Sequence, residues 1–334
     1  MTSDELILAS RPTGLPGAEN FTVRQVALPE PGEGEFRVRV EVISLDPAMR
    51  GWMSEGRSYV PPVEIGAVMR AFAAGTVEAS RHPGFPEGSS VVGMLGARSH
   101  ALSNGEGVYR IERARAPIER WVGGLGMPGM TAYFGLLRIG RPKDGETVAV
   151  AAAAGAVGQI VGQLAKLHGA RAVGIAGGPE KCRLLTETFG FDEAVDHRAP
   201  DMEARLKAAC PKGIDVYFEN VGGPIADACY RNMAMNGRVP VCGMISTYNG
   251  ESTEGLSLAA YRSILVNRLT VRGFLIFDFA ADIEEALTNL GRWHEEGRLV
   301  MREDVRGGGL GAFGAVLSDL YTGANTGKLV LKLD

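Results

Sequence analysis

The 334-residue sequence lacks the features that mark membrane-spanning, secreted and nucleic-acid-binding proteins. Its longest apolar run, residues 148–157, is far shorter than the roughly 20 residues that a membrane-spanning helix needs. Residues 1–11 contain Asp4 and Glu5 and have no apolar core of the signal-peptide kind. The net charge is −4, and no basic stripe interleaved with aromatic residues favours nucleic acid. We therefore expect a cytoplasmic protein that binds neither membranes nor nucleic acids.

Cysteine is scarce, and its spacing excludes the usual zinc and disulfide frameworks. The four cysteines are Cys182, Cys210, Cys229 and Cys242. No two of them form a C-x-x-C pair, and all lie in the second half of the chain. We expect reduced thiols that pack as small apolar side chains, and no bound metal.

Glycine is abundant at 46 residues, and the chain is long enough for two hydrophobic cores. Residues 36–43 alternate apolar and polar side chains, and more short strands separated by Gly- and Pro-rich turns follow. This pattern predicts that residues 1–125 form a partly closed β-barrel. Residues 293–334 are also predicted to be β-like, with a strand at 328–333. The segment 296–334 is expected to return to the first domain.

Residues 126–295 show a different pattern, in which apolar strands alternate with amphipathic helices. The apolar runs 147–152 and 170–176 are each followed by a segment with helical periodicity. Strands that are apolar on both faces and are joined by helices are typical of a parallel sheet covered on both sides. The fold class is therefore predicted to be α/β, with a doubly wound Rossmann domain over residues 126–295.

The turn after the first strand of this domain carries the clearest sign of a ligand. It reads Ala-Ala-Ala-Gly-Ala-Val-Gly and lies where a strand changes into a helix. Gly155 and Gly158, with Ala156 and Val157 between them, would let the backbone approach a pyrophosphate at the helix N-terminus. The first glycine of the usual G-x-G-x-x-G pattern is replaced by Ala153. Helix–strand packing alone is the alternative, but the strand–turn–helix context favours nucleotide binding.

The end of the second strand indicates which dinucleotide binds. A strand-end Asp or Glu would bind the ribose 2′-hydroxyl of NAD, but residues 173–178 contain no acid. Lys181, in the first turn of the next helix, is placed to pair with a 2′-phosphate beside Gly178. Glu180 is adjacent to it, and a solvated lysine is the ordinary alternative. The sequence therefore favours NADP(H) as the cofactor.

Six blocks of sequence, spread in order over nearly the whole chain, carry a family resemblance. They are Asp-Pro-Ala-Met-Arg-Gly at 46–51, Gly-Met-Pro-Gly-Met-Thr-Ala-Tyr-Phe-Gly at 126–135, Ala-Ala-Gly-Ala-Val-Gly at 153–158, Gly-Ile-Ala-Gly-Gly-Pro-Glu-Lys-Cys at 174–182, Phe-Glu-Asn-Val-Gly-Gly at 218–223 and Cys-Gly-Met-Ile-Ser-Thr-Tyr-Asn at 242–249. The chain resembles the zinc-independent double-bond reductases of the medium-chain dehydrogenase/reductase superfamily. That group includes prostaglandin reductases, leukotriene hydroxydehydrogenases and NADP-dependent alkenal and enone reductases. The resemblance implies a GroES-like β-barrel domain beside the Rossmann domain.

The resemblance also implies which residues meet the cofactor and the substrate. Cofactor contacts would come from Met127, Thr131, Gly155, Ala156, Val157, Gly158, Gly178, Lys181, His197, Asn220, Cys242, Gly243, Ile245, Ser246, Tyr248, Phe274, Leu275, Ile276 and Asn325. The substrate pocket would be lined by Ala48, Arg50, Trp52 and Tyr59. Family members often have Tyr in place of Ala48 and of His197, and Arg198 follows the latter.

Several of these residues have ordinary structural interpretations as well. Asn220 and Asn325 would serve equally as cap or turn residues. Arg50 would fit a structural salt bridge, and Trp52 and Tyr59 would fit core or lid packing.

The implied reaction is the reduction of a double bond conjugated to a carbonyl group. NADPH would deliver hydride to the β-carbon, and Tyr248 and the cofactor ribose would stabilise the enolate oxygen. A buried tyrosine with a satisfied hydroxyl is the alternative for Tyr248. A quinone reductase and a non-catalytic NADPH-binding protein are the rival functions. A homodimer is expected, with strand 269–277 pairing across a two-fold axis or lying inside the sheet.

Overall fold

The computed structural model describes residues 1–250 and 255–333, and the chain divides into two compact units. Unit 1 comprises Met1–Gly123 with Glu303–Asp334, and unit 2 comprises Gly124–Arg302. The sequence had suggested a second boundary at 295/296. The segment up to Arg302 stays with unit 2 because two buried glutamines on one helix bind its backbone. The Gln163 side chain pairs with both the N–H and the carbonyl of Val300, each at 2.8 Å, and Gln159 accepts from Arg302 N–H at 2.9 Å.

Unit 2 is built on a six-stranded parallel sheet in the order β10-β9-β8-β11-β12-β13. The chain order reverses between β8 and β11, which is the place where such sheets bind nucleotides. Val148, Val150, Val173 and Phe218 are fully buried, as the continuous apolar runs predict. The strands are β8 (Thr147–Val150), β9 (Arg171–Ala176), β10 (Glu193–Asp196), β11 (Ile214–Phe218), β12 (Met233–Val241) and β13 (Thr270–Gly273).

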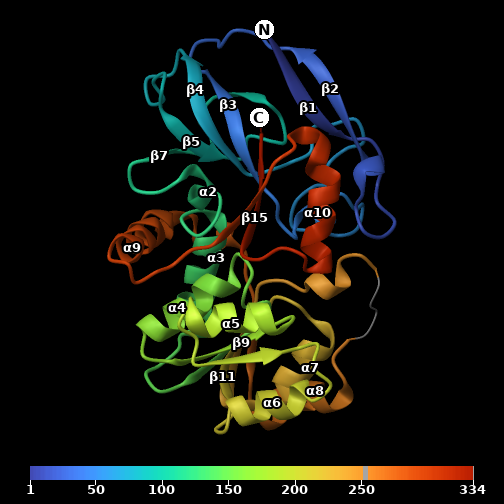
Figure 1. Ribbon diagram of the computed structural model, residues 1–334, viewed down its shortest axis with the longest axis vertical. Coiled ribbons are helices and arrows are strands. Elements are labelled where there is room, and N and C mark those ends of the chain that lie inside the picture. The colour runs from blue at the N-terminus through green and yellow to red at the C-terminus, as the bar shows by residue number, and fades with distance from the viewer. Residues whose placement is uncertain (251–254, 334) are drawn as a thin grey trace. The chain divides into compact units, whose positions relative to one another are not determined.

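Helices cover both faces of this sheet. Figure 1 shows α4 and α5 on one side and α6, α7 and α8 on the other, as right-handed crossovers require. Proline stands in the first turn of α3, α5 and α7, where its missing N–H costs no helical hydrogen bond. The helices are α3 (Met127–Phe134), α4 (Gly158–Leu167), α5 (Pro179–Glu187), α6 (Met202–Ala209), α7 (Gly223–Arg231), α8 (Leu258–Val266) and α9 (Ile283–Glu295).

Unit 1 is a β-rich domain with its own core. Its largest sheet has the order β14-β15-β3-β4-β5-β7, with β6 paired to β3, and β1 and β2 form a separate hairpin. Phe36, Val38, Ile43 and Phe313 lie in the core with no exposed surface. The elements are β1 (Thr2–Leu8), β2 (Phe21–Ala27), β3 (Phe36–Ser44), α1 (Met49–Trp52), β4 (Ala73–Ser80), β5 (Ser90–Gly93), β6 (His100–Ser103), β7 (Val108–Ile111), α2 (Ile118–Trp121), β14 (Glu303–Arg306), α10 (Phe313–Thr322) and β15 (Lys328–Lys332).

The prediction of a β-like tail is wrong in part. α10 is a helix, and α9 extends two residues past Trp293. In α10, Phe313 and Leu317 recur at helical spacing and are fully buried, so tertiary packing stabilises a helix amid glycine-rich turns.

The expected strand 269–277 is also too long. β13 ends at Gly273, and the Asp278 carboxylate accepts from Leu275 N–H at 3.0 Å to start a 3₁₀ segment.

A buried ion pair ties the last strand of unit 1 to the turn that follows β3. Lys328 Nζ on β15 donates to Asp46 Oδ1 at 2.8 Å and to the carbonyl of Leu45 at 2.7 Å. Asp46 Oδ2 accepts from the Ser44 hydroxyl at 2.5 Å. Burial lowers the pKa of Lys328, and Asp46 opposes that change. The pair fixes the start of the Asp46–Arg50 block that carries part of the family resemblance.

Two further observations bear on the expectations from composition. All four cysteines are free thiols, and Cys210 and Cys229 are buried in the core of unit 2. Within the part of the chain that the structure describes, no helix combines the length and the apolar character that crossing a bilayer requires.

Candidate cofactor site

The turn between β8 and α4 has the close packing that a dinucleotide loop needs. Ala152 adopts a left-handed conformation with a φ of 49°, and its carbonyl accepts from Gly155 N–H at 2.9 Å. A Cβ on Gly158 would lie 2.4 Å from the Ala152 oxygen and 2.7 Å from Ala153 Cα, so only glycine fits there. The N-cap of α4 is Val157, whose apolar side chain cannot cap the helix and leaves this end suited to an anion.

Basic side chains gather where β9 and β10 end. A Cβ on Gly177 would lie 2.8 Å from His197 Nε2 and 2.9 Å from Arg198 Nε, so both side chains lie directly beside this glycine. Asp196 Oδ1 accepts from the N–H groups of Gly178 and Arg198, each at 2.9 Å, and holds the two strand ends together. These backbone bonds lower the pKa of Asp196.

The charge in this cluster comes mainly from Lys181 and Arg198. Partial burial lowers the pKa of His197, and the nearby cations of Arg198 and Lys181 lower it further. The imidazole is therefore mostly neutral near pH 7, and protonation at lower pH would add a third positive charge. Arg198 was not among the predicted contact residues. Its position directly after His197 at a strand end was the available signal.

A second cluster forms where β11 and β12 end. Asn220 Nδ2 donates to the carbonyl of Ala151 at 2.8 Å, which bridges the ends of β11 and β8. Gly222, with a φ of 79°, is the N-cap of α7, so Asn220 is a bridge between strand ends and not the helix cap. The structure thus brings Asn220 to the switch point of the sheet.

The loop after β12 is bonded to this turn. Ile245 N–H donates to the carbonyl of Asn220 at 3.1 Å, and Ser246 donates its N–H and its hydroxyl to the carbonyl of Val221, at 3.0 and 2.6 Å. Tyr248 is partly exposed, and its hydroxyl accepts from Met244 N–H at 3.1 Å. Accepting one hydrogen bond makes a hydroxyl a better donor, so this contact suits a group that stabilises negative charge.

The remaining unit 2 residues of the predicted site have clear structural partners. Thr131 Oγ1 donates to the carbonyl of Met127 within α3 at 2.8 Å. Cys242 N–H donates to the carbonyl of Glu219 at 2.9 Å, and the residue is partly exposed although its thiol is buried. Burial raises the pKa of Cys242 to about 12, which argues against a reactive thiolate. Phe274 is buried after β13, and Leu275 and Ile276 follow it into the 3₁₀ segment.

Three of the four predicted substrate residues lie at α1 of unit 1, namely Ala48, Arg50 and Trp52. Arg50 is buried and donates to the carbonyls of Gly14 and Pro12, at 3.1 and 3.0 Å, and to the Ser54 hydroxyl. Arg50 therefore binds two backbone carbonyls and a hydroxyl. The sequence had offered a structural salt bridge with an acid as the alternative to substrate binding. Ala48 and Trp52 lie at the two ends of α1.

Trp52 and the two remaining predicted residues of unit 1 differ in exposure. Trp52 is buried, with the Arg70 guanidinium 5.5 Å from its ring centre, whereas Tyr59 is half exposed. Asn325 is buried and donates to the carbonyl of Gly327 at 2.9 Å, as a turn residue does.

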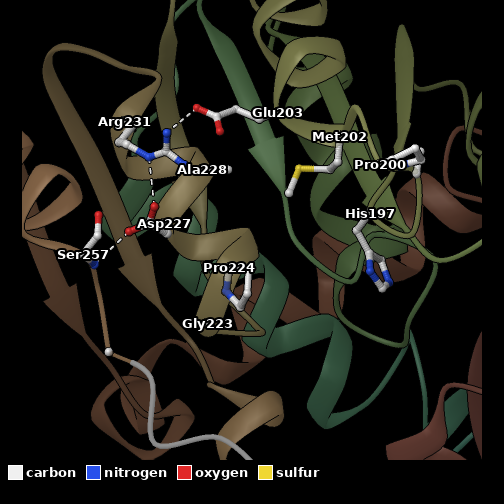
Figure 2. A pocket seen from close by; sticks show the side chains of 12 residues that line it. His197, Pro200, Met202, Glu203, Gly223, Pro224, Asp227, Ala228, Arg231 and Ser257 are labelled. Carbon is white, nitrogen blue, oxygen red and sulfur yellow. Dashed lines mark hydrogen bonds and ion pairs between the residues drawn. The ribbon is translucent and has the colours of Figure 1, made fainter.

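A cavity of about 630 Å³ opens beside His197 between α6 and α7. Figure 2 shows His197 on one side, an ion pair between Arg231 and Asp227 on the other, and Pro224 between them. Asp227 also accepts from Ser257 N–H at 2.8 Å. The sequence offered no signal for this cavity, because its walls come from two helices and a loop that are distant in the chain.

Comparison with known proteins gives a consistent family. A model described as the N-terminal domain of oxidoreductase matches residues 4–111, and one described as zinc-binding dehydrogenase matches residues 156–292. The NADPH-dependent curcumin reductase of Escherichia coli is 43% identical over 98% of this chain and 96% of its own length. The NADP(+)-dependent 2-alkenal reductase of Nicotiana tabacum is 39% identical over 99% and 97%. The chain belongs to the medium-chain dehydrogenase/reductase family.

A solved structure of this family supports the same architecture. CurA from Vibrio vulnificus in complex with NADPH is 42% identical, covers 99% of each chain and superposes with a TM-score of 0.93. The predicted fold class, a Rossmann domain with a GroES-like β-barrel domain, is confirmed. The family model that matches residues 156–292 is described as a zinc-binding dehydrogenase. Among residues 1–250 and 255–333, no three His, Cys, Asp or Glu side chains are grouped so as to hold a metal ion.

Proposed function

We propose that this protein is an NADPH-dependent reductase of the carbon–carbon double bond of enones and enals. The observation that carries the proposal is the basic cluster at the ends of β9 and β10, on the same sheet edge as the Gly158 turn. His197 and Arg198 lie beside Gly177, and the charge of Lys181 is near enough to lower the pKa of His197. The relatives named as NADPH-dependent curcumin reductase and 2-alkenal reductase support the reaction class.

The residues present fit NADPH along this edge of unit 2. The turn Gly155–Gly158 would hold the pyrophosphate, since a side chain at Gly158 would fill the space that the close backbone packing leaves. Lys181, Arg198 and His197 would hold the 2′-phosphate. The adenine ring would lie at the His197 end of the cavity between α6 and α7. When bound, the reduced nicotinamide supplies the hydride.

Tyr248 would stabilise the oxygen of the substrate carbonyl as it gains negative charge. Its hydroxyl is held by Met244 N–H on a loop that is fastened to the turn after β11. In unit 1, Ala48 would leave more room for the substrate than a tyrosine. Arg50 would hold the backbone near Pro12 and Gly14, with Trp52 and Tyr59 as the neighbouring wall.

The first assay is NADPH oxidation with a medium-chain 2-alkenal or an aryl enone as acceptor. Enone-dependent oxidation that is much weaker with NADH is the expected result. A simple quinone serves as the competing acceptor. Turnover of the quinone without turnover of the enone would replace the proposed reaction with quinone reduction. NADPH binding without any turnover would indicate a non-catalytic protein.

Replacing Tyr248 with phenylalanine should lower kcat with an enal about 10- to 100-fold, because one donor to the developing oxyanion is lost. The NADPH dissociation constant should change little, since the loop backbone is kept. Stopped-flow hydride transfer and NADPH fluorescence titration measure the two effects. Tyr109→Phe, at an exposed tyrosine of β7, is the matched control. Full activity of Tyr248→Phe would remove this residue from the mechanism.

We also propose that two copies of the chain associate through the β13 edge of unit 2. β13 is the last strand of its sheet, and all four of its residues are exposed. Leu258, Tyr261 and Leu265 on α8 are exposed by 82%, 66% and 79%, which is unusual for apolar side chains of this size. Antiparallel pairing of two β13 strands across a two-fold axis would satisfy the free edge of both copies.

The double substitution Val271→Asp and Leu265→Glu should convert a dimer into a monomer. It places one negative charge on β13 and one on α8, so both elements of the proposed interface would carry a charge into the contact. Light scattering coupled to size-exclusion chromatography gives the mass directly. Val23→Glu, at an exposed residue of β2, should leave the mass unchanged. A wild-type protein that elutes as a monomer at micromolar concentration would refute the association. We further propose that the protein is cytoplasmic, as the sequence predicts.

A further inference from the structure

Glu219 is a buried carboxylate at the centre of the predicted nicotinamide end of the site. It follows β11 directly and is 3% exposed. Its Oε1 accepts from Val221 N–H at 2.7 Å and from Gly222 N–H at 2.9 Å. These are the two residues that lead into α7, where the helix dipole also favours a negative charge.

The backbone of Glu219 holds the second loop. Its carbonyl accepts from the N–H groups of Cys242 and Gly243, at 2.9 and 3.1 Å, and its N–H donates to the carbonyl of Pro240 at 3.0 Å. One residue therefore bonds both the turn after β11 and the loop after β12. Because Val221 in turn accepts two hydrogen bonds from Ser246, the carboxylate is connected to the loop that carries Tyr248.

The surroundings of this carboxylate contain no cation among the described groups that face it. Those groups are Tyr217 on β11, Cys229 and Tyr230 on α7, and Cys242 after β12. Burial raises the pKa of all four, so they are neutral near pH 7. A buried carboxylate without a cation is costly, and a neutral amide would hold the same two N–H groups at a lower desolvation cost.

We propose that Glu219 is a positioning residue, whose carboxylate holds the turn after β11 and the loop after β12 in the arrangement that binds the nicotinamide half of the cofactor and presents Tyr248. This inference rests on the proposed function in one respect, which is that the ligand bound at these loops is NADPH. The bonds from Oε1 are short and charge-assisted, which is the stronger class of hydrogen bond. Losing them would let the Asn220–Gly222 turn relax and would move Ser246 and Tyr248 with it.

The position of Glu219 also makes the loops sensitive to pH. Burial raises the pKa of Glu219, although the N–H groups of Gly222 and Val221 oppose the change. A carboxyl group with a raised folded-state pKa contributes stability that is present below its unfolded value and lost as pH rises through the folded value. The ionised carboxylate is therefore the less stable form of the fold and the form that holds both loop N–H groups best.

Two substitutions and one control test the proposal. Glu219→Leu removes the acceptor, and Glu219→Gln keeps an acceptor oxygen but removes the charge. Gln163→Met is the control, because Gln163 is also buried and also bonds the backbone of a distant segment, at Val300. Three quantities are measured between pH 5 and pH 9. They are the NADPH dissociation constant by fluorescence, kcat with an enal, and the melting temperature.

Glu219→Leu should raise the NADPH dissociation constant at least about tenfold and lower kcat. Glu219→Gln should bind NADPH several-fold more weakly than wild type at pH 8, because the amide oxygen accepts both hydrogen bonds without the charge that strengthens them, and should melt at no lower temperature. The ratio of wild-type to Gln-variant NADPH affinity should fall toward one as pH falls through the raised pKa of Glu219, because protonation of His197 is common to both proteins and cancels in that ratio. Gln163→Met should lower only the melting temperature.

Two results would overturn the proposal. One is a folded Glu219→Leu protein with wild-type NADPH affinity and kcat. The other is a ratio of wild-type to Gln-variant NADPH affinity that does not change between pH 5 and pH 9, and this remains decisive if the Leu variant fails to fold. The binding measurements need no substrate. A lack of enal turnover would therefore refute the proposed reaction. The NADPH dissociation constants of the Glu219 variants would still test the positioning role.

Discussion

Replacing both Lys181 and Arg198 with alanine should abolish the preference for NADPH over NADH. The value of kcat/KM for NADPH should fall by about 100-fold or more, since each charge-assisted bond to a phosphate contributes about 1.5–3 kcal/mol. The value for NADH should change by less than about threefold, because NADH has no 2′-phosphate. His197 would not compensate near pH 7, since its pKa is lowered by burial and by these same cations.

Steady-state kinetics with both cofactors and one enal measure this change. Lys207→Ala, at an exposed lysine of α6, is the control for loss of positive charge elsewhere on unit 2. An equal fall for NADPH and NADH would mean general damage to the site. An unchanged value for NADPH would place the 2′-phosphate away from the ends of β9 and β10.

Replacing Lys328 with methionine should destabilise the protein by about 3–5 kcal/mol, because it leaves the Asp46 carboxylate buried without its cation. Lys328 and Asp46 are 2% and 8% exposed at their side chains, so water cannot replace the lost partner easily. Denaturant unfolding followed by fluorescence measures the loss. Lys332→Met, at the exposed residue of the same strand, should have little effect.

The double variant Lys328→Met with Asp46→Asn gives the sharper comparison. Removing both charges should restore part of the stability that either single change loses, since no buried charge then remains unpaired. A double variant that is less stable than both single variants, by the sum of their effects, would show that the two residues do not act as a pair.

The sequence was sufficient to predict the features that depend on periodicity and local geometry. Apolar runs at β8 and β9 predicted the parallel sheet, because strands buried on both faces must be apolar throughout. The close packing at Gly158 was predictable, since its place at a strand–helix turn leaves no room for a side chain. Its contact with a cofactor stays a prediction. These signals lie within a few residues of each other.

The sequence was insufficient where packing between distant segments decides. α10 was missed because its apolar face is stabilised only by the core of unit 1, and its glycine-rich flanks suggested turns. Arg198 was not chosen as a contact because its position after His197 at a strand end did not by itself show that its side chain lies beside Gly177. Glu219 was passed over because an acid after an apolar strand resembles an ordinary strand end, and its bonds to Val221 and Gly222 appear only in three dimensions.

The two clusters of the candidate site lie on opposite halves of one sheet. The basic residues belong to the ends of β9 and β10, whereas Asn220, Ser246 and Tyr248 belong to the ends of β11 and β12. Mutations in one half therefore need not disturb the other. Under the proposed roles of the two clusters, a lineage with this fold could switch between NADPH and NADH while it keeps the loop that carries Tyr248. It could equally change its substrate while it keeps its cofactor. The sheet separates these two traits so that selection can act on each independently.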